Sequence, residues 1–269
     1  MRINFNNQLE ALYAIDYCVN RRQNIIKQSG SAEEKQFFDE IYRIYLEKVS
    51  DVVRDDVQRI GDYRRKAEYV FNKDNPLPDL SAFDDFFQKY RSTQDRIVAD
   101  ITNGPVMKSL HLDALRSFFN ISADREINFI PSLFVNSVFS VFNGENNLII
   151  GVNYNPSAAR YEILERRISE IYYEFTRPYV QMALYEKNIG TNGNTEFLVE
   201  HITRVLEIIF STRIYGQQYI EQSLQSQDKM RLGQLRIFLS LYLEKQSKIY
   251  NLQNYIQFLT DAGLATQNQ

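Results

Sequence analysis

The chain has 269 residues, a net charge of −3 and 44% hydrophobic residues. This length suits one large domain or two small ones with a substantial core, and the composition is that of a globular rather than a disordered protein. Basic and acidic residues are interspersed, and the nearest approach to a basic patch is Arg64-Arg65-Lys66. We therefore expect no nucleic-acid partner, because binding phosphates requires a concentrated basic face.

The N-terminal region, residues 1–119, is predicted to be helical. A short strand at residues 2–5 precedes a helix that Asn6 or Asn7 caps. Ser31 and Glu34 have the spacing of a capping box before a second helix, which is followed by more helix over about 52–71. Gly61 is expected to interrupt that segment.

A connector at residues 72–79 divides these helices from the next ones. Pro76 and Pro78 disfavour helix there, and Ser81 with Asp84 is expected to open a helix that continues to about residue 101. Residues 103–105 end it, and another helix is predicted over about 106–119.

The second region, residues 120–269, begins with β-rich sequence. Residues 127–142 and 148–152 are apolar runs on either side of an Asn-Gly turn, which predicts a hairpin, with Pro131 at a bend or an edge. After residue 156 the chain is predicted to be helical, with helices at about 164–182, 196–214, 228–250 and up to 260. A loop at 190–194 separates the first two of these helices, and the tail at 266–269 is polar. The fold class that follows is α+β, mostly helical, with a small antiparallel sheet.

Common catalytic and cofactor motifs are missing from the sequence. Cys18 is the only cysteine, so an internal disulfide and a cysteine cluster for zinc are both excluded. No Gly-x-Ser-x-Gly elbow occurs, and residues 190–193 lack the lysine of a phosphate-binding loop. His111 is interpreted as a helix-surface or cap residue. His201 adjoins Glu200, but neighbours on a helix point about 100° apart, so we do not expect both to bind one metal.

No window of the sequence approaches the roughly 20 apolar residues of a membrane-spanning helix. Residues 1–7 also lack the apolar segment of a secretory signal. We therefore expect a cytoplasmic protein without a membrane partner, or a secreted one if a signal peptide has been removed. The oligomeric state is not predicted.

One helix carries a pattern of possible chemical importance. Residues 171–180 read Ile-Tyr-Tyr-Glu-Phe-Thr-Arg-Pro-Tyr-Val. In a zinc peptidase, two histidines four residues apart hold the metal from one helix face, and a glutamate between them activates the bound water. The glutamate is present here as Glu174, but Tyr173 and Arg177 stand at the two histidine positions.

The downstream helix extends the pattern, since it reads Glu200-His201 with Arg204 three residues on. Together with the preceding hairpin, this resembles the bacterial zincin-like domains of unknown function, a gluzincin-type group whose helix reads His-Glu-Phe-Ser/Thr-His. The resemblance covers roughly residues 120–260. It implies that the sheet packs on the helix pair, that Glu174 stands where the general base would be, and that Glu200 stands at the third ligand position.

The departure from the family pattern argues against zinc. Arginine is always cationic and repels a divalent ion, and a tyrosine does not replace a pair of imidazoles. We therefore expect no metal and no cofactor. Arg177 instead supplies a fixed positive charge near the former metal position, and we expect a cluster of Arg177, Glu174 and Glu200.

The resemblance implies a catalytically inactive homologue of zinc metallopeptidases that binds a peptide or protein segment in the former active-site cleft, by addition to the sheet edge. Two alternatives remain open. One is an active hydrolase that uses Glu174 or Glu200 in a non-standard site, and the other is a helical structural or interaction protein. The N-terminal helices are expected either to form a domain or to cover the cleft.

Overall fold

The computed structural model describes residues 1–19, 32–72, 74–122, 124–143, 145–155, 157–189, 195–225 and 229–265, with the side chains of 32–34 and 229–232 excepted. The predicted capping box at Ser31 and Glu34, the loop at 190–194 and the tail at 266–269 lie outside this description. The chain divides into two compact units. We call Met1–Lys108 with Glu126–Glu165 the sheet unit, and Ser109–Arg125 with Arg166–Gln269 the helical unit.

The α+β, mostly helical class is confirmed. The division into units differs from the predicted boundary at residue 120, because it groups the sheet with the N-terminal helices and assigns residues 109–125 to the helical unit. The physical reason is that β1, at the N-terminus of the chain, hydrogen-bonds to the strand at 127–132, so the two regions share one sheet.

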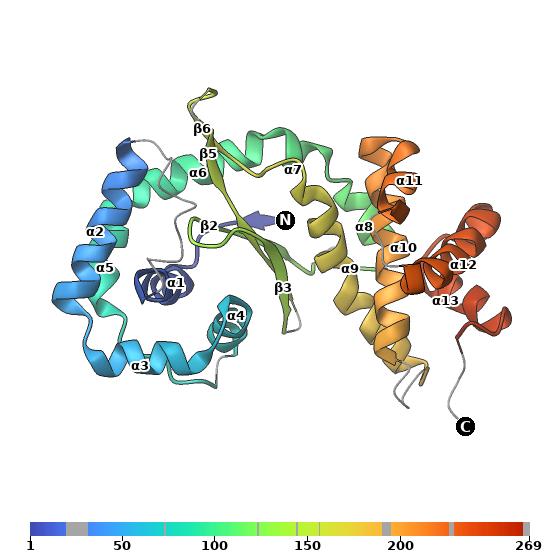
Figure 1. The fold of residues 1–269 in the computed structure, drawn as a ribbon, viewed down its shortest axis with the longest axis horizontal. Helices are drawn as coiled ribbons and strands as arrows, with labels where there is room; N and C mark the ends of the chain where they lie inside the picture. The colour runs from blue at the N-terminus through green and yellow to red at the C-terminus, as the bar shows by residue number, and fades with distance from the viewer. Residues whose placement is uncertain are drawn as a thin grey trace. The chain divides into compact units, whose positions relative to one another are not determined.

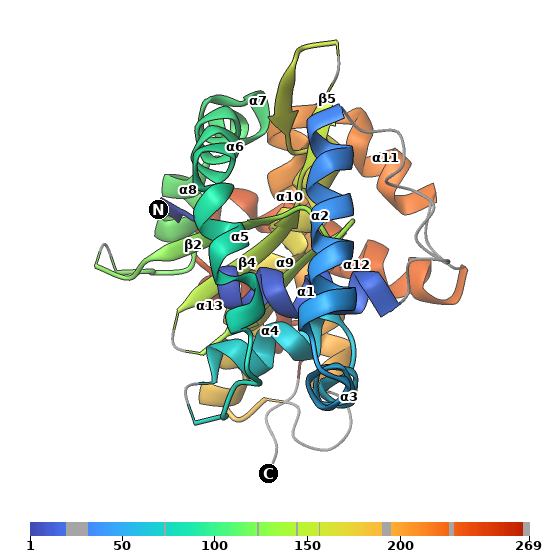
Figure 2. The same ribbon diagram turned by 90° about the vertical axis from the view of Figure 1, so that its left-hand side faces the viewer.

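The helices of the sheet unit begin with α1, and several of the others lie around it (Figure 1). They are α1 (Asn7–Val19), α2 (Ala32–Lys48), α3 (Asp51–Ile60), α4 (Tyr63–Phe71), α5 (Asp84–Lys89), α6 (Arg91–Asn103) and α7 (Pro105–Ser109), with a 3₁₀ turn at Ser81–Phe83. The predicted cap of α1 is confirmed, since the side chain of Asn6 accepts a hydrogen bond from the Leu9 amide at 3.0 Å. Helix α1 is buried almost all round and contacts α2, α3 and α4 (Figure 1 and Figure 2).

Two of the predicted helices are broken in the structure. The segment expected to be one helix from Ser81 to about 101 is a 3₁₀ turn followed by two helices, α5 and α6. Tyr90 separates these two helices. Asp79 rather than Ser81 provides the side-chain acceptor, at 3.1 Å from the Ser81 amide. The helix expected at 106–119 is likewise divided into α7 and α8 (Leu112–Phe118). His111 occupies the N-cap position of α8, but its side chain forms no capping hydrogen bond.

The main sheet has four strands in the order β1-β2-β4-β3, formed by β1 (Arg2–Ile3), β2 (Ile127–Ser132), β3 (Val138–Phe142) and β4 (Asn146–Gly151). The predicted hairpin is β3–β4, antiparallel with Phe142 opposite Asn146. The sheet as a whole was expected to be antiparallel, and this is wrong: β2 pairs in parallel with both β1 and β4.

The mixed sheet depends on a close crossing that the sequence pattern does not reveal. The chain leaves β2 and passes over the end of β4 before it returns as β3. At Gly151 a Cβ atom would lie 2.5 Å from the carbonyl oxygen of Val135, so only glycine permits this crossing. Pro131 fits within β2 because its nitrogen faces the side of β1, beyond the last residue that pairs there.

A second hairpin was missed, because the chain was expected to be helical after residue 156. Strands β5 (Asn153–Asn155) and β6 (Arg160–Glu162) pair with Tyr154 opposite Tyr161. They are too short for a period to be visible, and α6 supports them through Asp100, whose carboxylate accepts a hydrogen bond from the Tyr161 amide at 3.0 Å.

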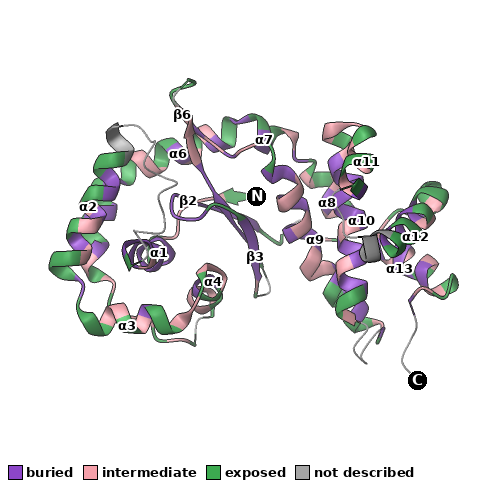
Figure 3. Cartoon of the chain, in the orientation of Figure 1, coloured by how far each residue is buried: buried purple, intermediate pink, exposed green. Residues whose placement is uncertain are grey.

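The helical unit contains α8, α9 (Arg167–Glu186), α10 (Thr195–Tyr215), α11 (Gln218–Gln225), α12 (Lys229–Lys245) and α13 (Leu252–Asp261), with a 3₁₀ turn at Gln246–Lys248. Helix α11 was not predicted, because its sequence is largely polar and only Leu224 is buried. Burial follows the elements in both units: α1, the strands β2, β3 and β4 and the inner faces of α9 and α10 are buried, whereas α2 and α3 expose their outer faces (Figure 3).

Among the described residues, none of the helices combines the length and the apolar character that crossing a membrane requires.

Candidate functional site

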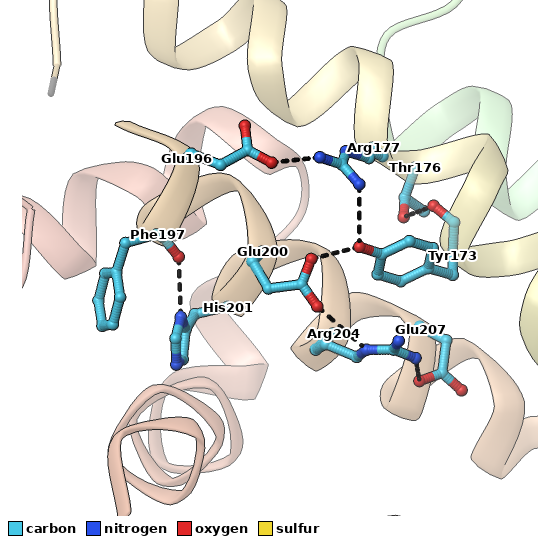
Figure 4. A network of polar contacts seen from close by, with 9 residues as sticks. All are labelled: Tyr173, Thr176, Arg177, Glu196, Phe197, Glu200, His201, Arg204 and Glu207. Carbon is cyan, nitrogen blue, oxygen red and sulfur yellow. Dashed lines mark hydrogen bonds and ion pairs between the residues drawn. The ribbon is translucent and has the colours of Figure 1, made fainter. Parts of the chain in front are cut away.

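The candidate site lies on the facing surfaces of α9 and α10. Tyr173 of α9 contacts Glu200 of α10, and Arg177 contacts Glu196. The step from Tyr173 to Arg177 runs four residues forward along α9, and the step from Glu200 to Glu196 runs four residues backward along α10. The two helices are therefore antiparallel, and these side chains are in register. We call Tyr173, Arg177, Glu196, Glu200 and Arg204 the Tyr173 network (Figure 4).

The hydroxyl of Tyr173 is the centre of this network. It donates a hydrogen bond to Oε2 of Glu200 and accepts one from Nη1 of Arg177 at 3.3 Å. The guanidinium of Arg204 lies 4.2 Å from the centroid of the Tyr173 ring, within range of a cation–π interaction. Burial raises the pKa of Tyr173, and the hydrogen bond to Glu200 raises it further, so the hydroxyl keeps its proton.

Arg177 stands at the second histidine position of the resemblance and pairs with Glu196, a residue that the sequence analysis did not single out. Burial on its own lowers the pKa of Arg177. The groups around it, Tyr173 and the carboxylates of Glu196, Glu200 and Glu174, outweigh burial and raise the pKa. The expected cluster is therefore present in a different form: Arg177 reaches Glu200 through the Tyr173 hydroxyl, and its ion pair is with Glu196.

Glu200 is held on both of its carboxylate oxygens. Oε2 accepts from Tyr173, and Oε1 lies 3.4 Å from Nε of Arg204. The same arginine reaches Glu207 at 3.6 Å, where Tyr219 also donates a hydrogen bond at 2.8 Å. Burial raises the pKa of Glu207, and the contacts with Tyr219 and Arg204 only partly oppose it.

Glu174, at the position of the general base, is buried, with 8% of its surface exposed. It follows Tyr173 in the chain and so points about 100° away from it around the helix. Pro178 lies one turn further along, inside α9. Because proline has no amide hydrogen, the carbonyl of Glu174 loses its regular helical partner, which bends a helix at this point.

His201 lies on a different face of α10 from Glu200. It is buried, its Nδ1 is 2.8 Å from the carbonyl oxygen of Phe197, and its ring packs against Phe197 and Phe238. This environment is that of a core histidine, and Figure 4 shows its ring directed away from the Tyr173 network.

The residues present do not fit a zinc ion. The described residues contain no group of three or more His, Cys, Asp or Glu side chains placed to hold a metal. At the three ligand positions of the resemblance, Arg177 offers only donors, and the proton of Tyr173 is directed at Glu200. No chemical step through zinc is therefore assigned to this site.

Glu196 and Glu207 are the residues that sequence reasoning missed. Glu196, Glu200 and Arg204 are spaced by four residues, so they lie along one face of α10. Pairing this row in antiparallel register with Tyr173 and Arg177 would have identified Glu196. Glu207 gave no comparable signal, because its partner Tyr219 is on the unpredicted helix α11.

No family model matches the sequence, and no curated protein or solved structure is similar to it at a significant level. The resemblance to zincin-like domains therefore stays a prediction from the motif residues.

Proposed function

We propose that this chain is a non-catalytic homologue of zinc metallopeptidases that binds a peptide or protein segment at its former active site. One observation supports the proposal above others: the hydroxyl oxygen of Tyr173 contacts both Arg177 and Glu200. The three positions at which the resemblance implies metal ligands therefore meet at a single point. Side chains from two helices that converge in this way fit a site where a metal ion was once held.

The replacement of the ligands explains the loss of the metal. Arg177 places a permanent positive charge beside the point of convergence, and Glu200 is shared between Tyr173 and Arg204. The arginine cation takes over the charge-balancing role that an ion would have.

Exposure of the network supports a binding role. About one third of the side chain is exposed in Arg177 (33%) and Arg204 (36%), and 69% in Glu196. A polypeptide segment presents backbone amides, carbonyls and charged side chains, which such donors and acceptors can recognise.

Addition of a strand to the sheet edge, the mode implied by the resemblance, is less favoured by the geometry. The outer strand β3 packs against α4, and Arg64 donates a hydrogen bond to the carbonyl of Ser140 at 3.3 Å. We therefore propose recognition through the side chains of the Tyr173 network. The alternative of a hydrolase using Glu200 is also less favoured, because both oxygens of that carboxylate are engaged. A helical structural or interaction protein remains the alternative function.

Restoring the ligands tests the ancestry directly. The double variant Tyr173→His/Arg177→His should bind zinc with one-to-one stoichiometry in calorimetric titration, because Glu200 would complete a three-ligand site. A matched control, Gln181→His/Tyr185→His, places two histidines at the same spacing on an exposed face of α9. We expect zinc affinity about tenfold or more above this control, and loss of the difference when Glu200→Gln is added. Equal affinity in a folded double variant would contradict the ancestry.

The binding role is tested separately, by selecting peptides from a random library on the unmodified chain. Selected peptides should bind Arg177→Gln and Glu196→Gln about tenfold more weakly, as expected when a charge-assisted contact is lost. Arg236→Gln, an exposed arginine on α12, is the control and should leave binding unchanged. If neither Arg177→Gln nor Glu196→Gln changes the affinity for the selected peptides, this surface is excluded as the binding site.

A further inference from the structure

A second candidate binding site lies in the helical unit, next to the C-terminal half of α9 and apart from the Tyr173 network. This is a pocket of about 370 Å³, which we call the Gln253 pocket. Its size is near the lower end of small-molecule sites, which are roughly 300–1,000 Å³. The residues that matter for its chemistry are Phe119, Arg125, Tyr179, Met182, Glu186 and Gln253.

One part of the lining is aromatic. The rings of Phe119 and Tyr179 lie 5.3 Å apart with 31° between their planes, and Phe119 also contacts Phe175 at 6.0 Å. Met182 adds a flexible apolar side chain that is 36% exposed. Such surfaces bind a planar apolar group well, because aromatic rings stack in offset or tilted pairs and methionine adapts to the ligand.

A second part is positive. Helix α13 begins at Leu252, and its first turn carries no acidic residue, so the positive end of the helix dipole is not compensated there. Arg125 lines the same pocket, and its guanidinium forms no hydrogen bond or ion pair with another described residue. Both features favour the binding of a carboxylate group of a ligand.

A third part is negative. Helix α9 ends at Glu186, and its last turn carries no basic residue, so the carboxylate and the helix dipole have the same sign. Within the described residues, Glu186 has no ion-pair partner, and the buried Oε1 atom of Gln253 accepts no hydrogen bond. A buried acceptor without a donor costs about 1–3 kcal/mol, and a ligand N–H group would remove that cost.

We propose that the Gln253 pocket binds a small zwitterionic ligand of the α-amino acid class with an aromatic side chain. Its carboxylate meets Arg125 and the first turn of α13. Its ammonium donates to Gln253 and faces Glu186, and its ring packs on Phe119 and Tyr179. This inference is independent of the proposed function, because no residue of the Tyr173 network lines the pocket.

Titration of the full chain with L-phenylalanine, by calorimetry and by amide chemical-shift mapping, tests the proposal. The analogues 3-phenylpropionate and 2-phenylethylamine each lack one of the two charges. We expect L-phenylalanine to bind about tenfold or more tightly than either, because each charge-assisted hydrogen bond contributes at least that factor. Shifts should concentrate at residues 119–125, 179–186 and 252–253.

Variants assign the binding to this pocket. Arg125→Gln and Gln253→Leu should each weaken L-phenylalanine about tenfold, whereas Arg236→Gln on α12 should leave the affinity unchanged. Chemical-shift spectra of the unliganded variants show whether they are folded. Absence of saturable binding at millimolar concentration overturns the proposal. Equal binding of 3-phenylpropionate, or equal weakening by Arg236→Gln, overturns it as well.

Discussion

The two units contain charged groups in contrasting surroundings. In the sheet unit, the side chain of Lys66 is 0% exposed, and its ammonium meets Asp16 at 3.1 Å and the carbonyl of Gly61. Gln58 donates to the same carboxylate at 3.2 Å. In the helical unit, the Tyr173 network has four charged side chains and leaves Arg177 and Arg204 about one third exposed.

The difference in exposure distinguishes a charged pair that stabilises the fold from charged groups that a partner can reach. A fully buried ammonium must be paired to be tolerated, so the Lys66–Asp16 pair joins α1 to α4 and has no free capacity for a ligand. An open network of charges contributes little to stability in water, because solvent screens it. Such a network remains accessible to a binding partner, as the proposed function requires.

Breaking the buried pair should have the largest effect. Lys66→Met leaves Asp16 without its cation in a site where only 13% of its side chain is exposed. We expect a loss of about 3–5 kcal/mol in the free energy of unfolding, measured by urea denaturation. Adding Asp16→Leu should recover part of that loss. Lys48→Ala on the exposed surface of α2 is the control, and a cost below about 1 kcal/mol for Lys66→Met would contradict the assignment.

The next largest effect is expected at Glu207, a carboxylate of α10 that is 3% exposed, and it depends on pH. Burial raises its pKa in the folded protein above the unfolded value of about 4.3. The folded state therefore retains a proton that the unfolded chain releases, and stability falls as pH rises from about 4 towards the raised pKa. The difference in unfolding free energy between the unmodified chain and Glu207→Gln should decrease from pH 4 to pH 7.

The exposed Glu221 of α11 provides the comparison for that measurement. Glu221→Gln makes the same substitution at an exposed position and so measures the effect of the substitution itself. A difference for Glu207→Gln that increases with pH would mean that the pKa of Glu207 is lowered in the folded protein.

A smaller effect is expected at the centre of the Tyr173 network. Tyr173→Phe removes the hydroxyl that joins Arg177 and Glu200 but keeps the ring on which Arg204 lies. The cost should be about 1 kcal/mol, typical of one hydrogen bond. Tyr185→Phe on the same helix, where the tyrosine is 80% exposed, should change nothing. A loss of 3 kcal/mol or more in the free energy of unfolding, on the order of a lost core side chain, would show that the main role of the network is to stabilise the fold.

The smallest effect is expected at Glu196, whose side chain is 69% exposed in its ion pair with Arg177. Glu196→Gln should change the unfolding free energy by less than about 0.5 kcal/mol, because exposed ion pairs contribute little. Combined with weaker binding of selected peptides, this result would separate recognition from stability at a single residue. A destabilisation above about 1 kcal/mol would mean that Glu196, like Lys66, stabilises the folded protein.

Much of the helical framework was predictable from local sequence. The cap at Asn6, the break at Gly61 and the approximate positions of α9, α10 and α13 follow from a cap, a glycine and apolar spacing, which act within one or two turns. The site was predictable in part. Tyr173, Arg177 and Glu200 were singled out and do converge, but the partner of Arg177 is Glu196 rather than Glu200.

The sequence by itself determined where helices form and which residues cap or interrupt them, because these choices depend on neighbouring residues. Only the tertiary structure decided which distant elements pair. The parallel pairing of β2 with β1 joins segments far apart in sequence, and its pairing with β4 depends on the crossing at Gly151. The pairing of Tyr173 with Glu200, and of Glu207 with Tyr219, depends on the registers between α9, α10 and α11. Those registers are set by side-chain packing over whole helix faces, which no short pattern encodes.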